Sequence, residues 1–178
     1  MDQAQIIQVL ASLIGGGLAG GCLTIIYNSF SARQRSNAKQ SATIAALIGE
    51  LKLAALICDV NGRVKGHVLP RYTHLPSSVS ARVAFAERDL YPLLKPSHSD
   101  LELYVLAATH MNEEIDFFSV LLLSPRDIQV VSSDYSTDIA DYCSGKATLT
   151  RFVPNVVVTL PELIAAQIRK LELIKTKR

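Results

Sequence analysis

The sequence has no tryptophan, only three cysteines and few charged residues. Charged residues make up 19% of the 178 residues, and hydrophobic residues make up 49%. The three cysteines (Cys22, Cys58 and Cys143) form no C-x-x-C pair, which argues against a zinc ribbon or a thioredoxin-type motif and is typical of isolated thiols in a reducing compartment. A formal net charge of +2 does not indicate a nucleic-acid-binding domain. The low content of charged residues and the high content of hydrophobic residues suggest that part of the chain lies in lipid.

Charge is absent from the N-terminal region. No charged residue occurs from Gln3 to Ala32, and no acidic residue occurs between Asp2 and Glu50. A helix needs about 20 apolar residues to cross about 30 Å of hydrocarbon. The charge-free stretch therefore predicts a transmembrane helix near Ile6–Phe30, within a membrane domain of residues 1–32.

The same region matches the dinucleotide-binding pattern G-x-G-x-x-G at Gly15, Gly17 and Gly20. That loop requires an acidic residue about 20 positions further on, which holds the ribose, and none is present there. A cleaved signal peptide is the other alternative, but it begins with positive charge, whereas this chain begins Met-Asp-Gln. We therefore expect a retained membrane anchor and no cofactor.

The glycines are better interpreted as packing residues. Membrane helices associate through close backbone approach, which small residues four positions apart allow. The span carries such residues, in a set that we call the small-residue ridge: Gln8, Ser12, Gly16, Gly17, Gly20, Gly21, Thr24 and Asn28. We predict a homo-oligomer that associates through this ridge. Two alternatives stay open, namely that small residues are simply common in membrane helices and that a ring of these helices lines a pore.

Positive charges follow the predicted span directly. Arg33, Arg35 and Lys39 lie after it, whereas Asp2 lies before it. The positive-inside rule then places the C-terminal side in the cytoplasm. The expectation is a single-pass protein of the inner membrane, with residues 33–178 as a cytoplasmic helical bundle domain.

The cytoplasmic part is predicted to be all-α. Apolar residues from Ile44 to Cys58 follow a helical stripe that ends at Asn61-Gly62, and no proline separates this stripe from the span, so one long helix is expected to enter the bundle. Four more helices are expected: one from Pro76-Ser77 to Pro92, one from a capping box at Ser99–Glu102, one from Ser124-Pro125 to Gly145, and one from a capping box at Thr159–Glu162. An extended linker is expected at Val153–Val158.

No catalytic or metal-binding motif is present: the sequence lacks H-E-x-x-H, G-x-S-x-G, a P-loop and Glu-x-x-His. The helix after the first capping box is expected to carry an apolar stripe: Leu103, Leu106, Ala107, Phe117, Phe118 and Leu121. On it, His110 and Glu114 are interpreted as a hydrogen-bonded pair rather than a metal site, because two ligands do not make a site. The next helix carries an acidic stripe that is interpreted as a solvated face: Asp134, Asp138 and Asp141.

The segment of residues 63–74, which we call the basic loop, holds the candidate binding residues. It contains one tyrosine, no acid and five basic residues: Arg63, Lys65, His67, Arg71 and His74. Such a cluster binds phosphate or an acidic surface on a protein or nucleic-acid partner. A polar connecting loop without a ligand is the alternative.

In arrangement, the whole chain resembles uncharacterised bacterial single-pass membrane proteins, with a small-residue membrane helix, a basic stop, a long helix containing ALIGELKLAAL and a compact helical remainder. In layout only, it also resembles the membrane-anchored accessory proteins of type VI CRISPR systems. That resemblance implies an oligomeric pore with a nuclease-like helical domain. The ribonuclease signature of that superfamily, an Arg followed by four to six residues and a His, is not matched: three residues separate Arg63 from His67, and two separate Arg71 from His74.

The sequence therefore favours a non-enzymatic, membrane-anchored, self-associating protein. It would act as an oligomeric scaffold, a sensor or a pore-type effector in phage defence or envelope stress. The alternative is an anchored nuclease-like enzyme that uses Arg63, His67, Arg71 and His74. The missing signature and the absence of a nucleophile or metal-ligand motif favour the first hypothesis.

Overall fold

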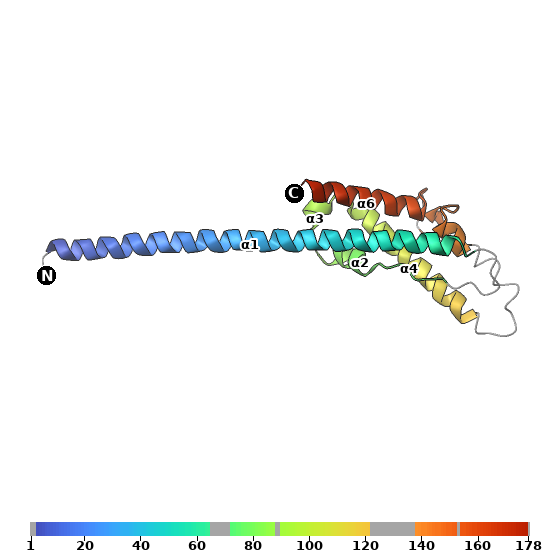
Figure 1. Ribbon diagram of the computed structural model, residues 1–178, viewed down its shortest axis with the longest axis horizontal. Coiled ribbons are helices and arrows are strands. Elements are labelled where there is room, and N and C mark those ends of the chain that lie inside the picture. Colours follow the sequence, from blue (N-terminus) through green and yellow to red (C-terminus); the bar gives the residue numbers. More distant parts are fainter. Residues whose placement is uncertain (1–2, 65–71, 88–89, 122–137, 153, 178) are drawn as a thin grey trace. The chain divides into compact units, whose positions relative to one another are not determined.

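The computed structural model describes residues 3–64, 72–87, 90–121, 138–152 and 154–177, and gives the backbone alone for residues 3–27, 120 and 121. By its internal contacts the chain divides into two compact units, residues 1–42 and 43–178. The described residues are mostly helical and include no strand (Figure 1), which confirms the predicted all-α class. An isolated antiparallel bridge joins Thr148 to Thr159.

Helix α1 spans Gln3–Gly62, so the predicted helix continues without a break to the predicted stop. It is long and apolar enough to cross a membrane. Among the residues with described side chains, the stretch that meets this condition is Asn28–Gly62, and 44% of its most apolar window is buried inside the molecule. Most side chains of the predicted span Ile6–Phe30 lie outside the described set. Of the small-residue ridge only Asn28 is described, and its side chain is exposed.

The last five turns of α1 form one wall of the core in the second unit. Ile44, Leu47, Leu51, Ala54 and Cys58 are each no more than 2% exposed and are spaced three or four positions apart, as the stripe predicted. A spacing of this kind keeps the residues on one helix face. Complete burial of a Leu or Ile side chain contributes roughly 1.5–3 kcal/mol, so this face accounts for much of the stability of the unit.

The helix predicted between Ser77 and Pro92 is wrong in its extent. Helix α2 covers Ser78–Phe85 and ends before a turn, and Pro92 lies in the first turn of a separate short helix, α3, at Tyr91–Leu94. A proline in the first turn has no intrahelical hydrogen bond to lose, so it is compatible with a helix start. Pro92 therefore marks the beginning of a helix rather than the end of one.

Helix α4 spans His98–Leu121 and packs against α2 and α6. Ser99 lies inside its first turn, so the prediction that Ser99 precedes the helix as its cap is wrong. The predicted apolar stripe is correct only in part: Ala107 and Phe118 are buried, whereas Leu106 and Phe117 are 44% and 51% exposed. The buried face also contains residues that the predicted stripe left out: Leu101, Tyr104, Ala108, Met111 and Ile115.

The C-terminal part agrees more closely with the predicted pattern. Residues 138–143 are helical, and Gly145 follows with a φ of 76°, the left-handed conformation expected after a helix end. The start of that predicted helix lies outside the described residues. After the short 3-10 helix η2 at Leu149–Arg151, helix α6 covers Leu160–Thr176 and carries the predicted capping box at Thr159 and Glu162.

Candidate functional site

The basic loop is described only at its two ends. Arg63 lies just after α1, and its Nη2 is 2.6 Å from Oδ2 of Asp59. His74 lies before α2, and its Nε2 is 2.8 Å from Oδ1 of Asp116 on α4. The other three candidates, Lys65, His67 and Arg71, fall outside the described residues. Both described basic residues thus have carboxylate partners.

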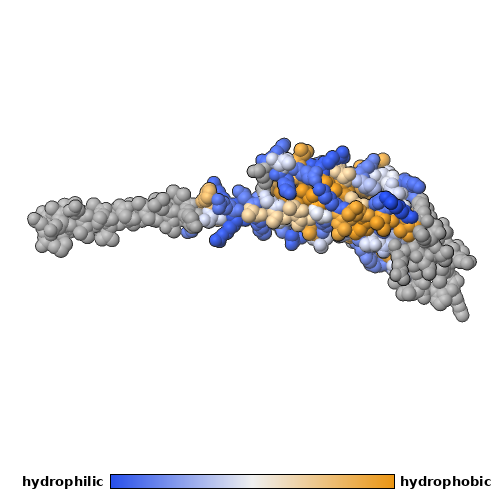
Figure 2. All heavy atoms as spheres, in the orientation of Figure 1, coloured by the Kyte–Doolittle hydropathy of each residue, from blue (hydrophilic) through white to orange (hydrophobic). Residues whose placement is uncertain are grey.

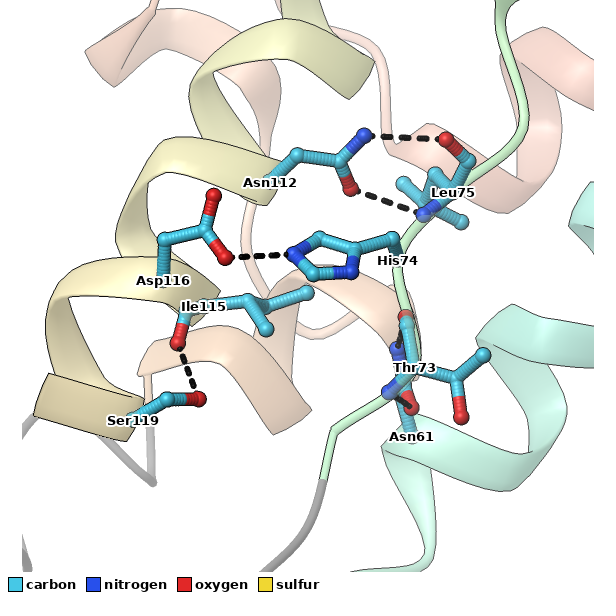
Figure 3. A network of polar contacts seen from close by, with 8 residues as sticks. All are labelled: Asn61, Thr73, His74, Leu75, Asn112, Ile115, Asp116 and Ser119. Atoms are coloured by element: carbon cyan, nitrogen blue, oxygen red, sulfur yellow. Dashed lines mark hydrogen bonds and ion pairs between the residues drawn. The ribbon is translucent and has the colours of Figure 1, made fainter. Parts of the chain in front are cut away.

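Two asparagines hold the chain where the basic loop returns to the bundle (Figure 3). Asn61, at the end of α1, donates from Nδ2 to the carbonyl oxygen of Thr73 at 2.8 Å and accepts from its amide nitrogen at 3.0 Å. Asn112, on α4, binds Leu75 with the same geometry: its Oδ1 accepts from the Leu75 amide at 2.7 Å, and its Nδ2 donates to the Leu75 carbonyl at 2.9 Å. Each amide therefore satisfies both backbone groups of one residue.

These contacts fix the position of residues 73–75 against α1 and α4. Asn61 is fully buried, so its amide needs these partners. His74 lies between the two held residues and points to Asp116 on α4, as Figure 3 shows. Sequence reasoning identified Asn61 only as part of a helix stop and did not identify Asn112. A polar residue with a partner far away in the sequence leaves no local pattern.

A second group of charged side chains surrounds a cleft of about 370 Å³ on the bundle surface. Its lining comes from α4 and from the segment around η2: His110, Glu113, Glu114, Phe117, Arg151 and Phe152. Arg151 lies 3.4 Å from Oε1 of Glu114 and 2.7 Å from Oδ2 of Asp138. One guanidinium therefore joins α4 to the helical residues 138–143, within a cleft that also carries two aromatic rings.

Glu114 has the most perturbed environment in this cleft. Burial raises the pKa of its carboxyl group, the Arg151 guanidinium lowers it, and the negative charge of Asp138 raises it again, with a net rise. Its Oε2 is buried and has no hydrogen-bond partner within the part of the chain that the structure describes. A carboxyl group whose pKa is raised by folding stabilises the fold at low pH, and this contribution is lost as the pH rises through the folded-state pKa.

The predicted pairing of His110 with Glu114 is wrong. His110 instead places Nδ1 3.3 Å from Oε2 of Glu113, three positions along α4, and its ring stacks on Phe152 with centroids 5.7 Å apart and an interplanar angle of 8°. Glu114 pairs with Arg151 instead. Arg151 lies outside α4, so the sequence of α4 alone does not predict this pair. Asp138, predicted to be solvated, also pairs with Arg151.

The charged groups of the cleft are already paired with one another. Arg151 contacts Glu114 and Asp138, His110 contacts Glu113, and the Oε2 atom of Glu114 is buried. Within the described ranges, His, Cys, Asp and Glu side chains form no group of three that could hold a metal ion.

Across its described ranges, the chain is an all-α protein in which one helix is long and apolar enough to cross a membrane. No protein-family model, curated protein or solved structure matches this chain. Its function is therefore argued from its own residues.

Proposed function

We propose that this protein is a membrane-anchored, self-associating scaffold of the bacterial inner membrane, with its helical bundle in the cytoplasm. The charge-free N-terminal stretch and the basic residues that follow it support the anchor and its orientation. Self-association is supported by a surface of α1 in the second unit.

That surface is a second apolar stripe on α1, distinct from the one in the core. We call it the α1 seam: Ala46, Gly49, Leu53, Leu56 and Val60, all exposed. The spacing alternates between three and four positions, which is the heptad pattern of helices that pack side by side. Figure 2 shows apolar side chains on the face of the second unit that is in view.

The exposure of the large seam residues is the observation that carries the proposal. Leu53, Leu56 and Val60 are 50%, 66% and 56% exposed. A continuous apolar stripe on a surface is unfavourable in water unless another molecule covers it. Gly49 lies within the seam, and nothing lies within 4 Å of the position where a Cβ would stand, so a partner backbone has room to approach.

The occupant that fits this seam is a second copy of the same chain. A heptad stripe is complementary to an identical stripe on a neighbouring helix, since side chains from each fill the gaps of the other. Charges of both signs flank it: Lys52 pairs with Glu172, and Asp59 pairs with Arg63. The predicted small-residue ridge lies on the same helix, so both predicted contacts belong to one element.

The test is a measurement of self-association by the full-length protein in detergent. Replacing Leu53 and Leu56 by Glu puts two charges in the seam, and we expect at least about a tenfold weaker association, equivalent to about 1.4 kcal/mol. The matched control is Leu106→Glu, an equally apolar exposed position on α4. Light scattering across a dilution series reports the assembly. Unchanged association of the double variant would refute the seam as a self-association surface.

The proposal includes no catalytic role. The alternative of a nuclease-like enzyme relied on the basic loop, and its two described members, Arg63 and His74, are paired with Asp59 and Asp116. A role in phage defence or envelope stress and a pore formed by the oligomer are extensions of this proposal. The scaffold hypothesis does not depend on either.

A further inference from the structure

Two of the three cysteines, far apart in the sequence, come together in the bundle. Cys58, in the last turns of α1, and Cys143, at the end of the helical residues 138–143, are both free thiols and both 2% exposed. Both residues line the same pocket, and each shifts the pKa of the other. Two neighbouring thiols are the arrangement from which a disulfide forms.

The backbone explains how the two thiols meet. Gly62, one helical turn after Cys58, faces Ser144, the residue after Cys143, so closely that a Cβ on Gly62 would lie 3.1 Å from the Ser144 amide nitrogen. Only a residue without a side chain permits this approach unless the Ser144 backbone moves. The end of α1 and residues 143–144 are therefore close together, and Cys58 and Cys143 line one pocket beside this approach.

Both cysteines line a pocket of about 380 Å³. Residues of α1, of residues 143–144 and of α6 line it, among them Cys58, Gly62, Cys143, Ser144, Ala165 and Ile168. Because each sulfur-bearing side chain is almost fully covered, only a small molecule reaches it. A hydroperoxide is small enough, whereas another protein that exchanges disulfides is not.

The two thiols are electronically unequal. The hydrogen bond with Cys143 and burial raise the pKa of Cys58, so Cys58 keeps its proton. The hydrogen bond from Cys58, together with one from Asn61, lowers the pKa of Cys143 despite burial. Thiolates, not thiols, attack oxidants. This difference favours Cys143 as the sulfur that reacts first.

We propose that Cys143 and Cys58 form a hydroperoxide-sensitive dithiol, with Cys143 as the reactive sulfur and Cys58 as the resolving one. The Cys143 thiolate attacks one oxygen of hydrogen peroxide, the O–O bond breaks, and Cys143 becomes a sulfenic acid as hydroxide leaves. The Cys58 thiol then attacks that sulfur. Its proton leaves with the hydroxyl group as water, and the disulfide forms with two electrons transferred to the peroxide in total.

Oxidation of the two thiols would also affect the contacts that hold the C-terminal end of the basic loop. Asn61 lowers the pKa of Cys143 and also holds Thr73 through both of its backbone groups. Conversion of Cys143 to a disulfide sulfur removes the negative charge that Asn61 favours. The dithiol thus shares a residue with the contacts that position residues 73–75.

The experiment uses the full-length protein with Cys22→Ser throughout, so that only the pair is present. After treatment with equimolar hydrogen peroxide, we expect an intact mass lower by about 2 Da, for two lost hydrogens, with no cross-linked dimer. Oxidised glutathione at the same concentration should produce no change within that time. A mass gain on glutathione instead would show that the sulfurs are not restricted to small oxidants.

Single variants separate the two roles. Cys58→Ser removes the resolving thiol, and peroxide should then leave a sulfenic acid on Cys143 that a cyclic 1,3-dione probe labels. Cys143→Ser should leave Cys58 unlabelled under the same conditions. Circular dichroism checks that each variant keeps its helical content. Equal labelling of both variants, or a folded parent protein that forms no intramolecular disulfide, would overturn the proposal.

Discussion

The carboxylate of Glu50 shows what one buried polar side chain contributes. Only 8% exposed on α1, it accepts hydrogen bonds from the Val79 amide at 2.7 Å, from the Ser80 amide at 2.8 Å and from the Ser80 hydroxyl at 2.6 Å. These donors form the first turn of α2, where the helix dipole favours negative charge. Glu50 therefore attaches α2 to α1.

We expect Glu50→Gln to destabilise the full-length protein by about 2–4 kcal/mol. The amide replaces a charged acceptor and directs an NH₂ group at buried donors, which then lack a partner. Urea unfolding measures the change. The control is Lys52→Ala, which removes an exposed ion pair with Glu172 and should cost less than about 1 kcal/mol. If both variants lose the same free energy of unfolding, the Glu50 carboxylate contributes no more to stability than an exposed ion pair.

At the scale of the element, α6 gives a pH-dependent prediction. Thr159 Oγ1 accepts from the Glu162 amide, and the Glu162 carboxylate accepts from the Thr159 amide at 3.1 Å. Hydrogen bonds from the backbone and the side chain of Thr159 lower the pKa of Glu162. This contribution to stability is present above the unfolded-state pKa, near 4.5, and is lost as the pH falls through the lower folded-state value.

Thr159→Ala should therefore cost about 1 kcal/mol at pH 7, and the difference from the parent protein should shrink on acidification below the unfolded-state pKa. Urea unfolding of both proteins across that range measures it. Subtracting one curve from the other removes the opposite pH dependence of Glu114, because both proteins contain it. A difference that stays constant down to the lowest pH would mean that the Glu162 carboxylate takes no part in the cap.

The elements also show which features a sequence specifies locally. The Thr159 cap, the stripe on α1 and the turn at Gly145 depend on residues within a few positions of one another, and all three were predicted correctly. The buried face of α4 was predicted only in part, because α4 has apolar residues on two faces and a 3.6-residue period fits both. Pro92 was misjudged because a proline is compatible with the start of a helix as well as its end.

The sites depend on residues that only the fold brings together. Asn112 holds Leu75 from 37 positions away, and Arg151 meets Glu114 across a similar distance in the sequence. The chain predicts which side chains are available but not which of them become neighbours. Cys58 and Cys143 were interpreted as isolated thiols for the same reason: they are 85 positions apart, and nothing local to either residue indicates the other.

At the scale of the whole molecule, two surfaces of α1 are proposed to drive self-association, the small-residue ridge and the α1 seam. Substitutions can test each of them separately. Replacing Gly16 and Gly20 by Leu adds bulk where the small-residue ridge requires close approach, while the span stays apolar enough to insert. The assembly in a bilayer should become smaller or dissociate more readily, as measured by light scattering or single-molecule photobleaching. Leu13→Ala with Leu18→Ala changes side-chain size on the same span away from the ridge and should have little effect.

Combining the ridge and seam variants decides how the molecule assembles. If the two surfaces act independently, Gly16→Leu and Gly20→Leu together with Leu53→Glu and Leu56→Glu should weaken association by the sum of the separate free-energy losses. A monomer in the combined variant, with partial assembly in each parent, is the expected result. If the glycine substitutions do not affect the oligomer, the predicted span serves only as an anchor. The α1 seam is then the proposed self-association surface that remains. An oligomer unaffected by the seam substitutions would assign assembly to the membrane helix instead.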